Sequence, residues 1–486
     1  MEQQALVRTV FGIKVKFHRQ ERNLSYQELA DLTGLAPSYI HDIERGKKYP
    51  KPDKIFILAK ALEVEYDYLV TLQANKRLQP IVDLLRSDFF KLFPLDTFGL
   101  DIHKTFDLFA ETPDKLNAFI STIVKMVRTH QLSQEEFYMA ALRSYQDLND
   151  NYFIEIEHAA KTLQESLKLP NGKALDESRI EMALLGEYGI KVDRTSLGAI
   201  PQLTSVRSFF QPQKKVLYLN DGLSVAQSKF LMGRELGFQV LGLKERPFET
   251  RLLKADSFEM LLNNFKASYF SVALMMHEEE IVKDLKKWLG QSKADEELML
   301  SLISKYGVTP EMLLQRITNM LSQHFGINEF FFIRMHTDET LSTFTMTKEL
   351  HLARQHTPHA NAADEHYCRR WASVNILKRI RTAKSSPLLF EQQISAYQEP
   401  PVSYYCFSIA EHDYRKSYSS VTIGLLVNQN LMNAAKFLND RSIKTRQVST
   451  TCEQCPIIDC NERVAPPIHL EREIGRNLLY EELKKL

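Results

Sequence analysis

The chain has 486 residues and a mass of 56.3 kDa, which at about 150 residues per domain predicts about three domains. Charged residues make up 25% and hydrophobic residues 44% of the chain, and these ordinary globular values exclude wholesale disorder and a fibrous class. Lys plus Arg number 62 and Asp plus Glu number 61, so a uniformly basic protein is excluded, whereas a single basic face is not.

Membrane and secretion signals are missing from the pattern. No apolar stretch follows a basic start, as a signal peptide would require. The longest uncharged run, residues 417–435, carries polar side chains throughout, unlike the roughly 20 apolar residues of a membrane span. Five cysteines are too few for a disulfide scaffold. We therefore expect a cytoplasmic protein that does not enter a membrane.

Residues 1–75 predict five short helices, with a helix-turn-helix at residues 24–64. Ser25 followed by Glu28 is a capping box that fixes a helix start. Gly34 supplies a tight turn, and Pro37 stands in the first turn of the next helix, where its missing N–H costs nothing. Ile40 and Ile43 bury one side of that second helix. Its polar side is left outward, as reading the major groove requires.

Charge supports a nucleic-acid role for this segment. Residues 8–60 contain 11 Lys or Arg against 6 Asp or Glu, and several follow the reading helix, where phosphates would lie. The segment resembles the Xre-type helix-turn-helix, and the resemblance implies a buried ion pair between Arg19 and Glu44. The alternative is a protein-interaction module with a coincidental basic edge. The predicted DNA-binding residues are Tyr26, Ser38, Tyr39, His41, Asp42, Arg45, Lys47 and Lys48. Asp42 either accepts from a cytosine amino group or bonds Lys47 or Lys48.

Residues 76–150 continue with helical spacing. Their apolar faces predict either a dimerisation interface or internal core. We expect a homodimer, because helix-turn-helix repressors read pseudo-palindromic operators as two-fold dimers.

The middle segment, residues 151–325, resembles the ImmA/IrrE metallopeptidase-like domain. In that family a helix carries H-E-L-G-H, whose two histidines bind zinc while the Glu acts as general base. Here the five residues are Arg234-Glu235-Leu236-Gly237-Phe238. Arg and Phe cannot hold Zn²⁺, and Glu259, at the third ligand position, cannot make the site alone. No catalytic residues are therefore predicted, and the cleft suits a small-molecule effector instead.

Residues 326–486 read as α+β, with strands rich in β-branched and aromatic residues around a helix near residues 369–380. The expected fold class is therefore mixed: an all-α helix-turn-helix N-terminus, an α+β metallopeptidase-like domain and an α+β C-terminal domain. The predicted boundaries are 1–75, 76–150, 151–325 and 326–486.

Three cysteines, Cys452, Cys455 and Cys460, lie within nine residues, and such a cluster suggests a metal before a disulfide. Cys368, at the start of a helix, can supply the fourth thiolate. Four thiolates hold either zinc or an iron–sulfur cluster; the alternative is four unrelated thiols. Cys406 alternates inside a strand and is expected to be a buried small hydrophobe.

The whole layout resembles the short-chain fatty acyl transcriptional regulators. The resemblance rests on four features: the helix-turn-helix, the degenerate middle domain, an isolated Cys368 before Trp371, and the tail C-x2-C-x4-C-x2-R-x-A-P-P that ends at Pro467. Cys368-Arg369-Arg370-Trp371 departs from the family's usual Cys-Pro-x-Trp. The resemblance implies a regulator of propionate, methylcitrate or glyoxylate metabolism genes that senses short-chain acyl-CoA. It favours an iron–sulfur cluster, of the [4Fe-4S] type, over zinc at the four cysteines.

Two other functions stay open. A redox- or iron-responsive regulator would use the cluster as its signal and bind no acyl-CoA. An ImmA-like peptidase is opposed by the missing histidines. The phosphates of CoA call for a basic pocket, and the sequence does not single it out. The basic candidates are Arg207, Lys214, Lys215, Arg234, Arg369 and Arg370.

Overall fold

A computed structural model describes residues 3–75, 78, 79, 82, 134–247, 257–352, 365–381, 387–398, 400–413 and 417–485. The chain forms two compact units. Unit 1 comprises residues 1–142 and 254–261, and unit 2 comprises residues 143–253 and 262–486. The boundary expected at residue 325 lies inside unit 2, because the helices before it and the strands after it share one hydrophobic core.

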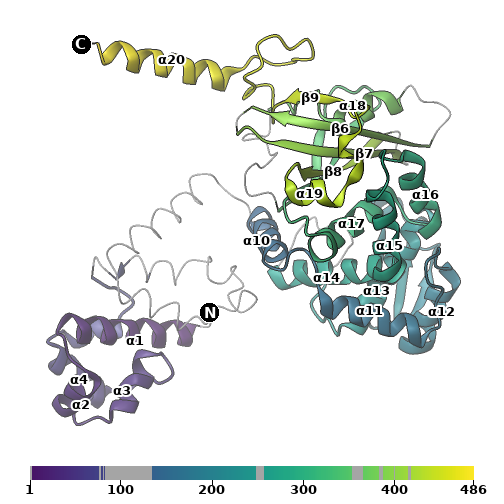
Figure 1. The fold of residues 1–486 in the computed structure, drawn as a ribbon. Coiled ribbons are helices and arrows are strands. Elements are labelled where there is room, and N and C mark those ends of the chain that lie inside the picture. The colour runs from purple at the N-terminus through teal and green to yellow at the C-terminus, as the bar shows by residue number, and fades with distance from the viewer. Residues whose placement is uncertain are drawn as a thin grey trace. The chain divides into compact units, whose positions relative to one another are not determined.

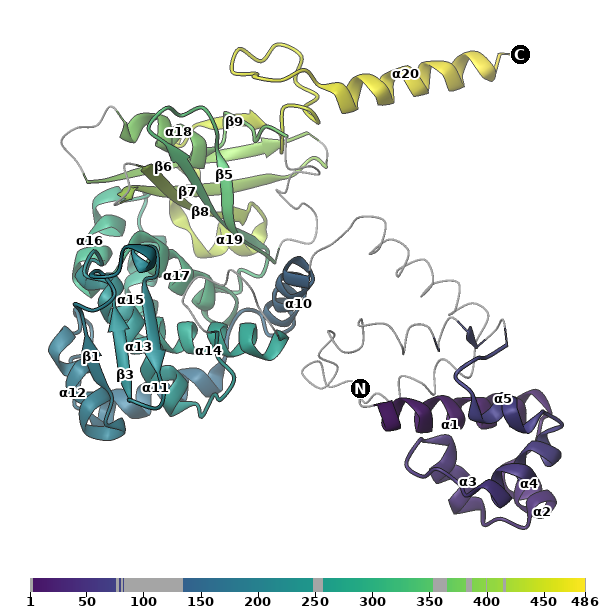
Figure 2. The same ribbon diagram turned by 180° about the vertical axis from the view of Figure 1, so that it is seen from behind.

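Unit 1 begins with five short helices, as the sequence predicts, and they pack into a small bundle (Figures 1 and 2). The expected capping box is present, because Ser25 accepts from the Glu28 backbone N–H while the Glu28 side chain accepts from the Ser25 N–H. The core of this bundle is built from one apolar face of each helix, including Phe11, Leu29 and Leu58. The helices are α1 Gln3–Glu21, α2 Tyr26–Thr33, α3 Pro37–Glu44, α4 Pro52–Leu62 and α5 Tyr66–Val70.

The expected helical and dimerising region 76–150 is covered only in part. Helix α10 spans Gln134–Leu148. Residues 76–133, apart from 78, 79 and 82, lie outside the described residues, and with them most of the predicted interface.

Unit 2 opens with the α+β segment that the sequence predicts. A small sheet has the order β1-β3-β2, with β1 parallel and β2 antiparallel to β3. Its strands are β1 Lys191–Asp193, β2 Ser208–Gln211 and β3 Val216–Leu219. The helices are α11 Ile154–Ser166, α12 Glu177–Tyr188, α13 Val225–Val240, α14 Phe258–Met275, α15 Glu278–Leu289, α16 Glu296–Tyr306 and α17 Pro310–Phe325; the division between the units falls within α14, after Leu261.

A six-stranded sheet follows, in the order β5-β4-β8-β7-β6-β9 (Figure 2). All neighbours are antiparallel except β6 and β9. The strands are β4 Phe330–Asp338, β5 Thr345–His351, β6 Leu388–Tyr397, β7 Ser403–Asp413, β8 Ser417–Leu426 and β9 Thr445–Val448. Phe332 and Phe407 point to the face that packs on α15–α17, whereas Phe331 and Cys406 point to the face that packs on α18 Ala372–Ile380. The alternation of side chains along a strand produces these two cores.

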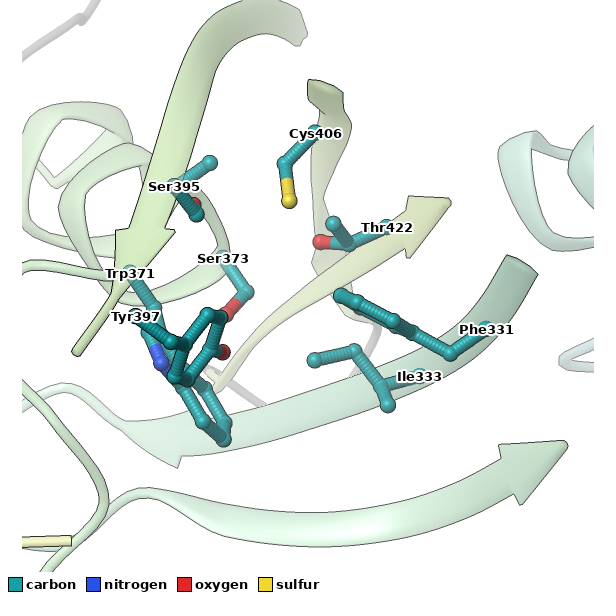
Figure 3. A pocket seen from close by; sticks show the side chains of 9 residues that line it. Phe331, Ile333, Trp371, Ser373, Ser395, Tyr397, Cys406 and Thr422 are labelled. Atoms are coloured by element: carbon teal, nitrogen blue, oxygen red, sulfur yellow. The ribbon is translucent and has the colours of Figure 1, made fainter. Parts of the chain in front are cut away.

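A cavity of about 10 Å³ lies between α18 and the sheet (Figure 3). Cys406, Ser395 and Thr422 line it with aromatic and aliphatic neighbours, and the buried Ser373 hydroxyl has no hydrogen-bond partner among the described residues. A space of this size holds about one water molecule. It therefore does not accommodate an acyl chain, and Cys406 is buried, as the sequence predicts.

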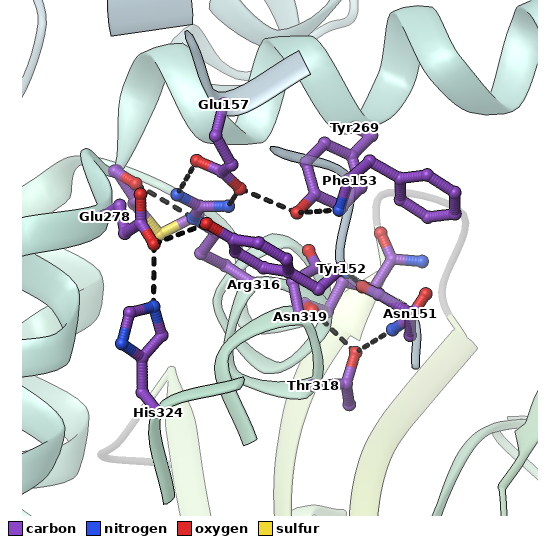
Figure 4. Close-up of polar contacts among 12 residues, drawn as sticks. Asn151, Tyr152, Phe153, Glu157, Tyr269, Glu278, Arg316, Thr318, Asn319 and His324 are labelled. Carbon is purple, nitrogen blue, oxygen red and sulfur yellow. Dashed lines mark hydrogen bonds and ion pairs between the residues drawn. The ribbon is translucent and has the colours of Figure 1, made fainter. Parts of the chain in front are cut away.

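A buried polar network ties α11, α14 and α17 together (Figure 4). The carboxylate of Glu157 accepts from Arg316 Nη1 at 2.5 Å, Arg316 Nη2 at 2.8 Å and the Tyr269 hydroxyl at 2.6 Å. Arg316 also donates from Nε to the Met276 carbonyl at 2.9 Å. Because all these groups are paired, the charges are tolerated in the interior. The network fixes the metallopeptidase-like frame to the helix that leads into the sheet.

The chain ends with α19 Gln429–Ala434 and the helix α20 Ile468–Leu483. Leu478, Leu479 and Leu483 of α20 are exposed. Among the helices of the described residues, none combines the length and the apolar character that crossing a membrane requires.

Candidate functional site

The reading helix of the predicted helix-turn-helix is α3. Helix α2 ends at Gly34, whose φ of 69° lies in the left-handed region and whose N–H donates to the Ala30 carbonyl. Pro37 opens α3 in its first turn. Ile40 and Ile43 are fully buried, while Ser38 is exposed and His41 and Asp42 are half-buried. The expected orientation of α3 is confirmed within the domain.

Close contact between α1 and α3 depends on Gly12. A Cβ atom at this position would lie 2.4 Å from the Ile43 carbonyl oxygen and 2.7 Å from the Glu44 carbonyl oxygen. No other residue type fits without displacing the α3 backbone. Glycine usually weakens a helix interior, so its presence inside α1 reflects this approach. No separate signal in the sequence predicts this close approach.

Glu44 at the end of α3 is bound to α1 and α2 by three contacts, which we call the Glu44 brace. Its carboxylate accepts from Arg19 Nε at 2.6 Å and Nη2 at 2.9 Å, and from the Tyr26 hydroxyl at 2.8 Å. The guanidinium also lies 4.1 Å from the centre of the Tyr26 ring. The side chains of Arg19 and Glu44 are 9% and 1% exposed. The brace therefore fixes the angle of α3.

Tyr26, a predicted DNA-binding residue, is half-buried. Its hydroxyl donates to Glu44 Oε2 inside the domain. Burial and the adjacent Glu44 carboxylate raise the pKa of Tyr26 to about 12. The sequence alone does not reveal this contact, because Glu44 lies 18 residues away.

The cations among the other predicted residues, Arg45, Lys47 and Lys48, form a basic edge at the end of α3. Lys48 pairs with Asp42 at 2.9 Å, and this hydrogen bond holds the pKa of Asp42 below its usual value. Asp42 therefore takes the lysine alternative. Lys54 lies 4.6 Å from the centre of the Tyr39 ring, a cation–π contact. Lys47 is exposed and Arg45 is half-buried. These charges provide the positive field that phosphate contacts need.

In the middle domain, the residues at the histidine positions are used structurally. Arg234 donates to Asn264 Oδ1 at 3.1 Å and Ser208 Oγ at 3.2 Å, and burial lowers the pKa of Arg234 to about 10. Phe238 lies under a second arginine, Arg246, whose guanidinium carbon is 4.2 Å from the ring centre. Neither position offers a metal ligand.

Glu235, which would be the general base, is neutralised by the same arginine. Arg246 Nη1 lies 3.0 Å from Glu235 Oε2, and Nη2 lies 3.0 Å from Oε1. The Glu235 side chain is 4% exposed. The general base of a metallopeptidase must accept a proton from a water molecule beside the metal. Here the lone pairs of the Glu235 carboxylate are directed at the Arg246 guanidinium. This arrangement opposes peptidase chemistry.

The predicted metal cysteines come together only in part. Cys368, Cys452 and Cys455 are buried and Cys460 is half-buried. Burial, with the neighbouring thiols of Cys455 and Cys452, raises the pKa of Cys368 to about 11. Among the residues that the structure describes, no three His, Cys, Asp or Glu side chains are placed to hold a metal ion. The thiol set suits a metal chemically, but this conformation does not present a finished site.

The cysteine loop, residues 452–463, is held by Arg463. Its Nη1 donates to the Cys452 carbonyl at 2.8 Å, and its Nη2 donates to the Ile457 carbonyl at 2.5 Å and the Cys455 carbonyl at 3.3 Å. Beside the loop lies a polar cleft of about 250 Å³. Ser449, Thr450, Gln454 and His469 line it with Tyr397, Gln398, Val448, Pro456 and Leu470.

Comparisons with known proteins agree with this organisation. Residues 15–69 match the helix-turn-helix family, and residues 186–318 match the IrrE N-terminal-like domain. The chain is 33% identical over 73 residues to the control protein C.SmaI of Serratia marcescens, covering 87% of that protein and 15% of this chain. It is 39% identical over 61 residues to the HTH-type transcriptional repressor RghR of Bacillus subtilis, covering 45% of that protein and 12% of this chain.

A solved structure of a Mycobacterium tuberculosis transcriptional regulator aligns with a TM-score of 0.48 at 16% identity, over 68% of this chain and 94% of that chain. The helix-turn-helix match and the identity to C.SmaI carry the assignment. The chain belongs to the Xre-type helix-turn-helix family of transcriptional regulators and carries an IrrE N-terminal-like domain after its DNA-binding helices.

Proposed function

We propose that this protein is a ligand-responsive transcriptional regulator that binds a pseudo-palindromic operator as a homodimer. The observation that carries the proposal is α3, with its apolar side buried, its end fixed by the Glu44 brace and its outer side flanked by basic residues. A rigid reading helix with cations beside it suits major-groove binding. Dimerisation is proposed because two-fold operators need two reading helices about one turn of DNA apart.

The test is salt-dependent binding of the full chain to DNA from its own promoter region, measured by fluorescence anisotropy. Lys47→Ala should weaken binding similarly on all sequences and reduce the salt slope by about 1, as expected for one lost phosphate contact. Lys287→Ala, an exposed lysine of unit 2, is the matched control and should leave the slope unchanged. Equal slopes for Lys47→Ala and wild type would contradict the placement of α3 on DNA.

The effector in this proposal is a short-chain acyl-CoA, and the regulated genes are those of propionate, methylcitrate or glyoxylate metabolism. The supporting feature is the polar cleft of about 250 Å³ beside the cysteine loop, close to the size of ordinary small-ligand sites. Thermal unfolding with acetyl-, propionyl-, butyryl- and palmitoyl-CoA against free CoA tests it. A short-chain thioester at 100 times its Kd should stabilise the protein by about 2.7 kcal/mol. No shift with any thioester would refute the effector class.

An iron–sulfur cluster at Cys368, Cys452, Cys455 and Cys460 also stays a prediction, with zinc as the alternative. The proximity of Cys368 to Cys452 and Cys455 supports it, whereas the half-buried Cys460 would have to join them. Iron, zinc and inorganic sulfide content of anaerobically purified protein separates the two metals. Iron and sulfide that disappear in Cys460→Ala would support the cluster, and a chain that binds neither metal would refute both. Iron with sulfide but no acyl-CoA response would favour the redox-responsive regulator.

A further inference from the structure

Three cations from two parts of the C-terminal fold converge on one carboxylate of the cysteine loop. They are Arg370, two residues before α18, Lys378 on α18 and Arg446 on β9, and we call them the basic cluster. Glu462 lies 3.2 Å from Lys378 Nζ, 3.7 Å from Arg446 Nη1 and 3.9 Å from Arg370 Nε. The side chains of Lys378, Arg446 and Arg370 are 38%, 34% and 19% exposed. The cluster is therefore open to solvent.

One carboxylate does not satisfy these three cations. Only the contact with Lys378 is a hydrogen bond, because the two arginine contacts are longer than 3.5 Å. Arg370 makes one weak further bond from Nη1, to the Gln447 carbonyl at 3.5 Å. Each guanidinium offers five N–H donors in a fixed fork that matches phosphate oxygens. Three positive charges against one negative charge also leave the cluster with a net charge of +2, since the three cations and Glu462 sum to that value.

Glu462 is kept at the basic cluster by its neighbours in the loop. Arg463, the next residue, holds the carbonyls of Cys452 and Ile457, and Cys460 lies two residues before Glu462. The carboxylate therefore lies at the cluster because of the conformation of the cysteine loop. A change in that loop would withdraw it and expose all three cations together.

We infer that Arg370, Lys378 and Arg446 form a binding site for a phosphate group, and that Glu462 occupies this site as an intrachain competitor. A phosphate carries more charge and more acceptor oxygens than a carboxylate, so it pairs with both guanidiniums and the ammonium at once. The strand that supplies Arg446 also supplies Val448 of the polar cleft. A ligand with a phosphate at the cluster and a polar body in the cleft fits this arrangement.

The identity of the natural ligand as a CoA thioester rests on the proposed function, whereas the phosphate site does not. Pyrophosphate and free CoA are therefore used as separate probes in calorimetric titrations of the full chain. Glu462→Gln keeps the shape of the side chain and removes its charge. It should tighten pyrophosphate binding by up to about fivefold, because an exposed ion pair is worth up to about 1 kcal/mol. Arg446→Gln in the Glu462→Gln background should remove that gain.

Glu391→Gln is the matched control, since Glu391 pairs with Arg379 at another place on the same domain. Unchanged pyrophosphate affinity in Glu462→Gln, or an equal gain in Glu391→Gln, would overturn the inference. A gain for both pyrophosphate and CoA would support the site and the proposed effector together. A gain for pyrophosphate with no binding of free CoA would keep the phosphate site and refute the CoA moiety as its occupant, whereas the thioester comparison described above tests the acyl-CoA effector.

Discussion

Removing Glu44 should destabilise the helix-turn-helix more strongly than removing the whole ion pair. Glu44→Ala leaves the Arg19 guanidinium buried at 9% exposure without its partner, and such a loss costs about 3–5 kcal/mol. A small domain has only about 5–15 kcal/mol of stability, so much of it would be lost. Arg19→Met combined with Glu44→Leu removes both charges. The main remaining penalty is the unpaired Tyr26 hydroxyl, about 1–3 kcal/mol.

Hydrogen exchange of the α2 and α3 amides in the full chain measures this local stability, and urea dependence shows whether the helices open together. The expected order is wild type, then the double variant, then either single variant. The effect should depend little on salt, because the pair is buried. Two outcomes would refute the role assigned to the brace. One is a loss of stability in the double variant that equals the sum of the losses in the two single variants, and the other is a loss below about 1 kcal/mol in Glu44→Ala.

Three further outcomes follow from the packing. Gly12→Ala places a Cβ 2.4 Å from a carbonyl oxygen of α3. It should therefore lower the stability of the helix-turn-helix domain by about 1–3 kcal/mol and weaken operator binding. Wild-type hydrogen-exchange protection of the α3 amides would contradict this. Burial raises the pKa of Cys406 to about 12, so iodoacetamide at pH 8.5 should leave it unmodified in folded, metal-free protein. The half-buried Cys460 should be labelled, as peptide mass spectrometry would show. Arg246→Met should cost about 3–5 kcal/mol, because the buried Glu235 carboxylate loses its ion-pair partner and keeps the hydrogen bond from Gln239 Nε2. Denaturant unfolding monitored by exchange in α13 checks it; wild-type stability would show that the pair is dispensable.

Sequence reasoning succeeded where the signals are local. The spacing of Ser25 and Glu28, with Gly34 and Pro37 after them, determines α2 and α3 because each signal acts within about one helical turn. It was less successful with strand β6, Leu388–Tyr397, which was not predicted. Its centre, Glu391-Gln392-Gln393, interrupts the apolar pattern. The strand forms because β7 pairs with one of its edges and β9 with the other. The sequence of the β6 segment alone does not reveal this pairing.

The sequence by itself determined the helix-turn-helix, the loss of the zinc histidines and the clustering of the cysteines, since residue type and spacing are enough for each. Only the tertiary structure decided what those residues contact. The Tyr26 hydroxyl binds Glu44, Arg246 pairs with the would-be base Glu235, and Glu462 contacts cations from α18 and β9. These contacts depend on how separate elements pack against one another. A charged side chain pairs with the oppositely charged group that the fold places within a few ångströms of it.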